Sequence, residues 1–377
     1  MQRGEAAQAL PLLRRLALEQ RGNVDVLFAL GMAHGMLNQD AEAEAVFREA
    51  ARLRPDLRDA HLNIAFSLVY QGRLREAIAP FLAARKLAPG DRAVDENLIT
   101  VLLSILQDEP GGGAQSCMPL EVVEATPLVS VIMPTRDRPQ LLRDALHSVA
   151  RQSYPNWEAI VVNDGGADIA GVVRSLAPQA AARTTLLQNS TSQGTARTRN
   201  RAISAAKGAI LAFLDDDDLF LPEHLAMLVE AMVPGGAPVA YTESVAIEER
   251  IDAGRRIEIR RGTPRQYRYS RALLLVRNMI PTANWGMRRE CFERWGDFDD
   301  SLACAEDWDL LLRFSEKTPF LRIARTTTEI RVRAGTPDSV TQRVPLRPTC
   351  DLLYRRYPAG ANELIALGRE VYAASVT

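Results

Sequence analysis

The chain has 377 residues, of which 47% are hydrophobic and 25% are charged, so it holds enough apolar material for two globular domains. A formal net charge of -1 excludes the overall positive field that draws proteins to nucleic acids, and no nucleic-acid partner is expected. The cysteines stand too far apart for a zinc site, a redox pair or a disulfide-stapled domain, which predicts reduced thiols at Cys117, Cys291, Cys304 and Cys350.

Polar and charged side chains interrupt every apolar stretch near the N-terminus, so no signal peptide is expected. No later segment holds the ~18 uninterrupted apolar residues of a spanning helix, so we expect no transmembrane segment. The sequence therefore predicts a cytoplasmic protein, and any membrane contact would be peripheral, at the inner face.

Residues 24–107 carry apolar side chains at three- and four-residue spacings, which predicts helices throughout this range. The range also matches itself at an offset of 34 residues, with small, aromatic and proline positions in register. The matched pairs are Phe28 with Leu62, Leu30 with Ile64, Gly31 with Ala65, Ala43 with Ala77, Phe47 with Phe81, Ala50 with Ala84, Leu53 with Leu87, and Pro55 with Pro89.

This pattern resembles the tetratricopeptide repeat, in which small residues let two antiparallel helices approach and a proline ends the second helix. The resemblance implies a repeat module at residues 1–107, with a partial repeat around Leu12, Leu13 and Leu16 and a capping helix at Asp95 to Leu106. Such stacks present a concave surface, so a protein partner is expected there. A helical bundle with a coincidental repeat is the alternative.

The helical periodicity stops after Gln107, and a glycine-rich stretch predicts a linker at residues 108–127. From Leu128 short apolar runs alternate with helical segments, which favours an α/β domain with a mainly parallel sheet between helices. Ligands of such sheets bind at the carboxyl ends of the strands. Expected strands are 129–133, 157–162, 184–188 and 209–214, and expected helices are 140–151, 167–176 and 195–206.

Polar clusters follow each expected strand, and the last is a run of four aspartates at residues 215–218. Successive carboxylates repel one another unless a cation or solvent relieves them. Hard cations such as Mg2+ or Mn2+ choose carboxylate and phosphate oxygens, and they typically use one or two protein carboxylates beside a substrate diphosphate. The alternative is a solvated acidic turn in which Asp218 caps the next helix.

Residues 128 to about 335 resemble the family-two glycosyltransferases of the GT-A fold. The matching segments are VSVIMPTRDRP, NDGG, TRNRAISAAKG, AFLDDDDLFLP and EDWDLLLRF, in that order. The resemblance implies an organisation of repeats at 1–107, a linker at 108–127, a GT-A domain at 128–340 and a C-terminal helical extension at 341–377.

The resemblance also implies roles for individual residues. Asp217 would be the direct ligand of Mg2+ or Mn2+ bound to the donor diphosphate. Arg199 matches an arginine near the nucleotide, with an exposed helix position as the alternative. His224 follows the acidic run, but imidazole suits Zn2+ better than Mg2+, so a solvent-facing position is expected. The residues implied for nucleotide binding are Pro134, Thr135, Asp137, Asp164, Arg199, Asp215 and Asp216.

Glu306 and Asp307 are expected at a helix N-terminus, where negative charge is favoured and capping alone would explain an aspartate. In the family the aspartate at this position is the general base, which implies a catalytic role for Asp307 with Glu306 beside it. Many relatives carry a histidine shortly after the following strand, where it helps to hold the metal. Residues 329–336 contain none.

The sequence thus predicts an inverting glycosyltransferase that moves a sugar from a nucleoside-diphosphate donor, expected to be uridine-linked, to an acceptor hydroxyl. The acceptor would be a saccharide, a lipid-linked sugar or a protein. A catalytically inactive scaffold that binds a partner through its repeats is the alternative. A nucleotidyltransferase would need a glycine-rich basic loop after the first strand, where this chain has TRDRP.

Overall fold

The computed structural model describes residues 3–109, 124–233, 236–252, 255–265, 268–333 and 344–376. Contacts divide the chain into two compact units. The first comprises Met1–Glu109 with Ala359–Thr377, and the second comprises Pro110–Pro358. Within the described ranges, no helix is both long and apolar enough to cross a bilayer.

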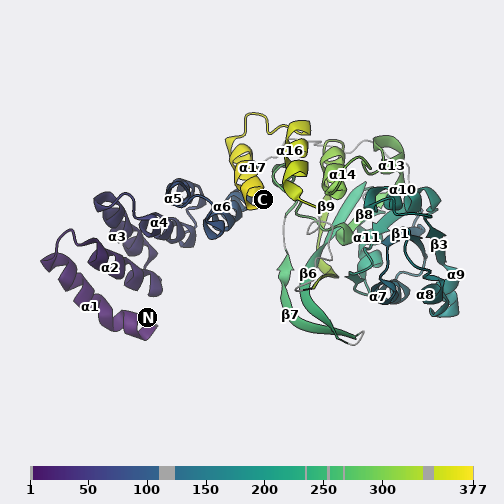
Figure 1. Ribbon diagram of the computed structural model, residues 1–377, viewed down its shortest axis with the longest axis horizontal. Helices are drawn as coiled ribbons and strands as arrows, with labels where there is room; N and C mark the ends of the chain where they lie inside the picture. The colour runs from purple at the N-terminus through teal and green to yellow at the C-terminus, as the bar shows by residue number, and fades with distance from the viewer. Residues whose placement is uncertain are drawn as a thin grey trace. The chain divides into compact units, whose positions relative to one another are not determined.

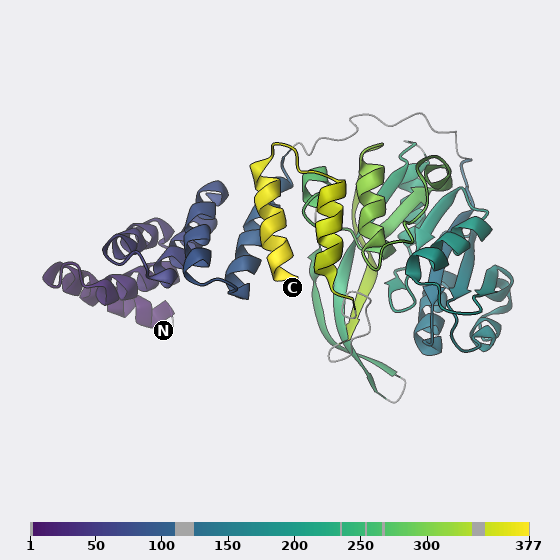
Figure 2. The ribbon, with the colours of Figure 1, turned by 45° about the horizontal axis from the view of Figure 1, so that its top comes forward.

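The first unit consists of helices. Three of them start at a residue whose side-chain oxygen accepts backbone N–H bonds of the first turn, namely Asn23, Asp91 and Asn362. The last helix of the chain, α17, packs beside α6, and both views show the two side by side (Figures 1 and 2). The helices are α1 (Arg3–Glu19), α2 (Val24–Met36), α3 (Asp40–Leu53), α4 (Arg58–Tyr70), α5 (Leu74–Leu87), α6 (Arg92–Leu106) and α17 (Glu363–Ser375).

Several of the positions that recur at the 34-residue offset lie in the core of this unit, whereas Leu53, Pro55, Leu87 and Pro89 are exposed. Ala43, Ala77 and Phe81 are fully buried, and Phe47 is nearly so. A Cβ at Gly31 would come within 2.7 Å of the Phe47 ring, so glycine is needed for α2 to approach α3 this closely. The recurring small residues therefore do what the repeat pattern requires, while their assignment to the tetratricopeptide class stays a prediction.

The second unit is built on one sheet with the strand order β3-β2-β1-β4-β8-β6-β9-β5, and β7 pairs with β6. Strands β3, β2, β1 and β4 are parallel, whereas β8 runs antiparallel to both β4 and β6. The strands are β1 (Val129–Thr135), β2 (Trp157–Asn163), β3 (Thr184–Gln188), β4 (Ile210–Phe213), β5 (Leu219–Phe220), β6 (Val239–Asp252), β7 (Arg255–Arg265), β8 (Trp285–Arg288) and β9 (Leu321–Arg333).

Helices cover both faces of this sheet (Figure 1). The apolar sides of α7, α8 and α11 form one core with alternate residues of β1, β2 and β4. Helix α10 contacts β1 and β2. Phe213 of β4 packs against the rings of Trp285 and Phe298, which come later in the chain. The helices are α7 (Pro139–Ala150), α8 (Ala170–Arg174), α9 (Pro178–Ala182), α10 (Thr195–Ala205), α11 (His224–Met232), α12 (Arg271–Leu274), the 3-10 helix η1 (Thr282–Asn284), α13 (Arg289–Trp295), α14 (Glu306–Ser315) and α16 (Leu346–Arg356).

The expected fold class is confirmed: an all-helical region precedes an α/β domain whose first four strands are parallel. The expected helix at 167–176 is shorter than predicted and is followed by a separate short helix, α9. Most of the expected linker lies outside the described residues. Of the two helices in the expected C-terminal extension, α16 belongs to the second unit and α17 to the first.

Candidate functional site

The carboxyl ends of β1, β2 and β4 meet at one edge of the sheet, because these strands are parallel neighbours. Thr135 is the last residue of β1, and its carbonyl accepts the N–H of Asp164, which follows β2. The Thr135 hydroxyl donates to Asp216 at 2.7 Å. Pro134 is partly buried beside Thr135 and pairs in register with Val162. Residues from three different segments therefore form this edge.

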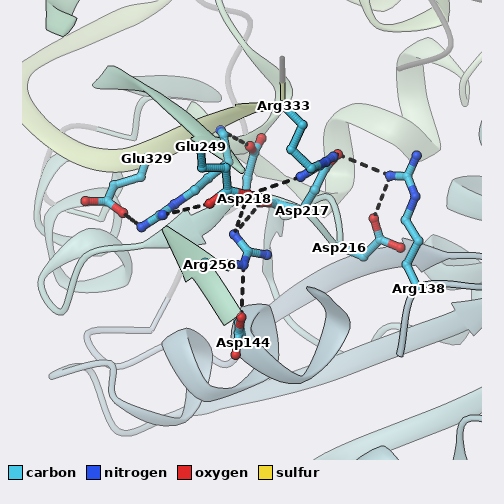
Figure 3. A network of polar contacts seen from close by, with 10 residues as sticks. Arg138, Asp144, Asp216, Asp217, Asp218, Glu249, Arg256, Glu329 and Arg333 are labelled. Atoms are coloured by element: carbon cyan, nitrogen blue, oxygen red, sulfur yellow. Dashed lines mark hydrogen bonds and ion pairs between the residues drawn. The ribbon is translucent and has the colours of Figure 1, made fainter. Parts of the chain in front are cut away.

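Each aspartate of the acidic turn between β4 and β5 has polar partners, and Arg138 is shared by Asp216 at 3.2 Å and Asp217. Asp215 pairs with Arg199 at 2.7 Å, and the Asp218 carboxylate accepts the backbone N–H of Arg331 at 2.8 Å. One oxygen of Asp217 is shared by two guanidinium groups, Arg138 at 3.1 Å and Arg333 at 2.6 Å (Figure 3). The turn is therefore a compensated cluster and not a freely solvated acidic loop.

Two of these carboxyl groups have strongly shifted acidities. Burial raises the pKa of Asp216 to about 7, and repulsion from Asp217 adds to the shift. Burial, followed by repulsion from Asp217 and Asp215, raises the pKa of Asp218 well above its usual range. Among Asp216, Asp217 and Asp218, solvent reaches Asp217 most easily. The side chain of Asp217 is 20% exposed, whereas the side chain of Asp216 is 6% exposed and Asp218 is 8% exposed.

Arg199 joins the acidic turn to the start of α14. Its guanidinium pairs with Glu306 at 2.8 Å and with Asp215 at 2.7 Å, and it lies 5.5 Å from the centre of the Phe298 ring. The residue is buried, so the alternative of an exposed helix position is wrong. Arg199 lies on the face of α10 that packs inward, and the carboxylates of Asp215 and Glu306 compensate its buried charge.

Asp307 lies beside this bridge in the first turn of α14. Its carboxylate accepts hydrogen bonds from the Asn278 amide and from the backbone N–H of Trp308, both at 2.8 Å. Burial, then repulsion from Glu306, raises the pKa of Asp307 to about 6, while Arg199 opposes the shift. The preceding residue, Ala305, has a positive φ of 57°, a conformation that side chains rarely adopt.

Asp164 closes the loop that leads into α10. Its two oxygens accept bonds from Asn189, Ser192, and the backbone N–H groups of Gln193 and Gly194. Burial alone would raise the pKa of Asp164, but these four donors together lower it below its usual value. The carboxylate is therefore ionised and holds this loop in shape.

Asp137 lies in the exposed loop after β1 and has a positive φ of 55°. Its carboxylate accepts the backbone N–H of Ala167 at 3.0 Å. It thus ties the loop after β1 to the loop after β2, and no bond connects it to the acidic turn within the described residues. Only a glycine fits at position 166, because a Cβ there would come within 2.7 Å of the Asp137 carboxylate.

His224 corrects an expectation. It was expected to face solvent, but it is fully buried, stacks on Phe220 and bonds the Thr327 hydroxyl through Nδ1 at 2.7 Å. Helix α11 packs this side against β9, and burial lowers the pKa of His224 to about 3. It is a neutral core residue.

Sequence reasoning missed three residues of the site. Arg138 and Arg333 contact Asp217, and Asn278 holds Asp307. Arg138 is the second arginine of TRDRP, in the polar loop after the first expected strand, so it could have been predicted from the sequence. Asn278 lies in an irregular segment with no recognisable motif, and only the folded chain brings it to α14.

A site for Mg2+ or Mn2+ at the acidic turn would need oxygen ligands from these carboxylates. Within the described ranges no three His, Cys, Asp or Glu side chains converge as a ligand set. Asp217 nevertheless offers one partly exposed carboxylate at the strand edge, and hard cations often use one protein carboxylate with a substrate diphosphate. The described residues form no cage made by the protein alone, and because Oδ2 of Asp217 is already paired with Arg138 and Arg333, a cation shared by Asp217 and a diphosphate stays a prediction.

Residues 130–296 match the model of the family described as Glycosyl transferase family 2. The chain is similar to this family over that segment, which is less than half of its length. The segment contains the strand ends, the acidic turn and Arg199, whereas Glu306 and Asp307 follow it.

Two relatives from Escherichia coli are similar in sequence to part of this chain. WcaA of Escherichia coli (strain K12), a glycosyl transferase assigned provisionally to colanic acid biosynthesis, is 31% identical over 50% of this chain and 66% of its own length. The E. coli protein WfgD, named as a UDP-Glc:alpha-D-GlcNAc-diphosphoundecaprenol beta-1,3-glucosyltransferase, is 32% identical over 30% of this chain and 44% of its own length. The chain therefore spans two thirds or less of these relatives.

Among solved structures, the mannosyltransferase PcManGT from Pyrobaculum calidifontis, in complex with GDP-Man and Mn2+, is similar to this chain with a TM-score of 0.49. It is 16% identical, and the match covers 80% of this chain and 85% of that chain. This likeness is too distant to assign residues or ligands.

Proposed function

We propose that this protein is an inverting glycosyltransferase that moves a sugar from a nucleoside-diphosphate donor, uridine-linked in the simplest case, to an acceptor hydroxyl. The observation that carries the proposal is the Arg199 bridge. It connects Asp215 of the acidic turn with Glu306, the neighbour of Asp307, although the two carboxylates are 91 residues apart in sequence. One region of the domain thereby holds acidic groups suited to opposite ends of a displacement.

The residues divide the chemistry between them. Asp307 accepts the proton of the acceptor hydroxyl as its oxygen attacks the anomeric carbon of the sugar. The bond from that carbon to the donor phosphate breaks, and its electron pair goes to the diphosphate. Asp217 would hold Mg2+ or Mn2+ beside the diphosphate, and such a cation stabilises the charge of the leaving group. Attack from the face opposite the leaving group inverts the anomeric centre.

The pKa of Asp307, about 6, suits a general base at neutral pH. Most of the group is then ionised, yet it is more basic than an ordinary aspartate. Asn278 holds one of its oxygens, so the carboxylate has a fixed orientation. The segments that follow β1, β2 and β4 are also proposed to bind the nucleotide, through Pro134, Thr135, Asp137, Asp164 and Asp216.

The acceptor is proposed to be a saccharide or a lipid-linked sugar, with a protein as the other candidate. The names of WcaA and WfgD, which refer to polysaccharide assembly and to a lipid-linked diphosphate, support the first two. We further propose that α2–α5 are tetratricopeptide-like repeats that hold the acceptor or a protein partner. A variant lacking residues 1–90 retains α6, which packs against α17. This variant should retain donor hydrolysis and lose transfer to the native acceptor.

The decisive test is a screen of nucleotide sugars for metal-dependent release of the nucleoside diphosphate. Asp217→Asn should lower release about hundredfold or more, because the shared cation loses its carboxylate. Asp144→Asn is the matched control, since Asp144 is also paired with an arginine, Arg256 at 2.9 Å, but lies on α7 outside the acidic turn. A wild-type protein that neither binds nor turns over any nucleotide with metal present would favour the inactive scaffold instead.

A further inference from the structure

A small hollow in the second unit is lined by uncharged side chains. Its walls include Thr242 and Ser244 of β6, residues 279–281 and Asn284 of η1. The hollow is partly open and has room for about one water-sized group. A single hydroxyl group fits this space, whereas a phosphate or a carboxylate would meet no charged partner among the described residues of the lining.

Two hydroxyl groups of this lining, those of Thr242 and Ser244, have no hydrogen-bond partner within the described part of the chain. Both residues are fully buried. Asn284, by contrast, is already used: its amide donates to the Thr242 carbonyl and its side-chain oxygen accepts the Thr328 hydroxyl, both at 2.7 Å. An unpaired buried hydroxyl destabilises the fold, and a hydroxyl can both donate and accept. The hollow therefore offers two open bonding positions to a small neutral guest.

The hollow lies level with the acidic turn along the strands of the sheet. Strands β4 and β6 run in the same direction because β8 is antiparallel to both, and Gly286 of β8 pairs with Ala212 and with Ala240. Thr242 and Ser244 follow this level on β6 as the acidic turn follows it on β4. Ligands of such sheets bind at the carboxyl ends of the strands. The two hydroxyl groups are therefore on the side of the domain where a substrate is expected.

A short chain of contacts connects the hollow with Asp307. The Asn278 amide donates to the Asp307 carboxylate at 2.8 Å, and the Asn278 side-chain oxygen accepts the backbone N–H of Ile280 at 2.9 Å. Ile280 lines the hollow, and its carbonyl accepts the indole N–H of Trp285 at 3.1 Å. The segment that orients the proposed base thus also forms a wall of the hollow.

We propose that Thr242 and Ser244 bind a second hydroxyl group of the acceptor, next to the one that loses its proton to Asp307. This inference rests on the proposed function and narrows the acceptor to a sugar unit, free or lipid-linked, because a sugar carries neighbouring hydroxyl groups. The side chains of serine, threonine and tyrosine in a protein acceptor carry only one. The second hydroxyl supplies the bonds that Thr242 and Ser244 lack.

The test is an NMR titration of the full-length protein in the presence of UDP and Mn2+, and again with GDP and Mn2+. The probes are the methyl glycosides of glucose, galactose, mannose and N-acetylglucosamine, with the amides of N-acetylserine and N-acetylthreonine as protein-like probes. At least one glycoside should bind. Thr242→Val and Ser244→Ala should each weaken its binding about threefold to tenfold, as expected for a neutral hydrogen bond, and leave the nucleotide affinity unchanged.

The melting temperature separates ligand binding from a structural role. Each variant removes an unpaired buried hydroxyl, so neither should melt below the wild type. One monodeoxy analogue of the bound glycoside should show the same loss with the wild type and no further loss with the variants, because both changes delete the same bond. Ser67→Ala, which removes a buried hydroxyl from α4, is the matched control and should bind the glycoside like the wild type.

The proposal is overturned if the nucleotide binds and no glycoside does, if a blocked amino acid binds in place of the glycosides, or if both variants bind the glycoside normally. A lower melting temperature with unchanged glycoside binding also overturns it, because the hollow would then hold only a structural water. A wild-type protein that binds neither UDP nor GDP overturns the proposed function itself, so the two failures are distinguishable.

Discussion

The two units of this protein use charged side chains differently. In the helical unit many ion pairs are local and exposed, such as Arg52 with Glu49 or Arg92 with Glu96 one helical turn away. At the sheet edge the pairs are buried and join distant segments, as in Arg199 with Glu306. Exposed pairs add little stability, whereas buried charges carry a desolvation cost. The costly arrangement occurs where the proposed chemistry takes place.

The units also differ in what holds them together. The helical unit relies on fully buried small residues and on ring contacts such as Phe66 with Phe81 at 5.7 Å. The acidic turn relies on compensation of like charges by arginines from other elements. Substitutions should therefore separate the two: changes in the helical core should affect folding, and changes at the sheet edge should affect catalysis.

The largest effect is expected for Asp307→Asn. It keeps the shape of the side chain but removes the base, so the rate of sugar transfer should fall about 10²- to 10⁴-fold with little change in the free energy of unfolding. Steady-state kinetics and chemical denaturation of the same preparation measure both quantities.

Asp309→Asn is the matched control on the same helix. Asp309 is fully buried and accepts bonds from Arg313, Arg356 and Tyr357, which makes it structural. This variant should lose stability, by about 3–5 kcal/mol if the buried pairs are broken, and keep its rate per folded molecule. The reverse pattern in the two variants would contradict the assignment of Asp307.

Phe81→Ala should have the next largest effect, and only on the helical unit. It removes a fully buried ring from between α4 and α5, which typically costs about 3–5 kcal/mol of folding free energy. Hydrogen exchange of the amides in α2–α5 should speed up, while the affinity for nucleotide stays constant. Tyr70→Ala, at a residue 73% exposed, is the control that should leave exchange unchanged. Loss of nucleotide affinity in Phe81→Ala would show that the units are not separable.

The pH dependence of transfer should show a moderate effect. The pKa of Asp307 is about 6 and the base acts when ionised, so kcat should fall about tenfold per pH unit below that value and level off above it. Glu306→Gln removes the neighbouring charge that raises this pKa, so the acid limb should move to lower pH. An unmoved limb in this variant would mean that another group controls the profile.

The smallest effect is expected for Arg52→Ala in the helical unit. Its pair with Glu49 is exposed at both ends, with side chains 67% and 44% accessible. Solvent and salt screen such a pair, so the melting temperature and the transfer rate should not change measurably. A clear fall in melting temperature would contradict the expectation that exposed local ion pairs add little stability.

Much of the fold could be predicted because local patterns determine it. The strand expected at 184–188 is β3 with the same bounds, and the helix expected at 195–206 differs from α10 by one residue. Apolar periodicity gives such elements directly, and parallel strands bring their carboxyl ends together. Thr135 and Asp216 consequently meet as their strand-end positions imply.

What the sequence by itself determined is the order of the elements and the acidic groups at the strand ends, because both follow from periodicity and strand direction. Only the tertiary structure decided which charges meet. Arg333 reaches Asp217 across 116 residues because β5 pairs with β9 in one register, and Asn278 reaches Asp307 through an irregular segment. Such long-range pairings depend on packing of the whole domain, which no local pattern encodes.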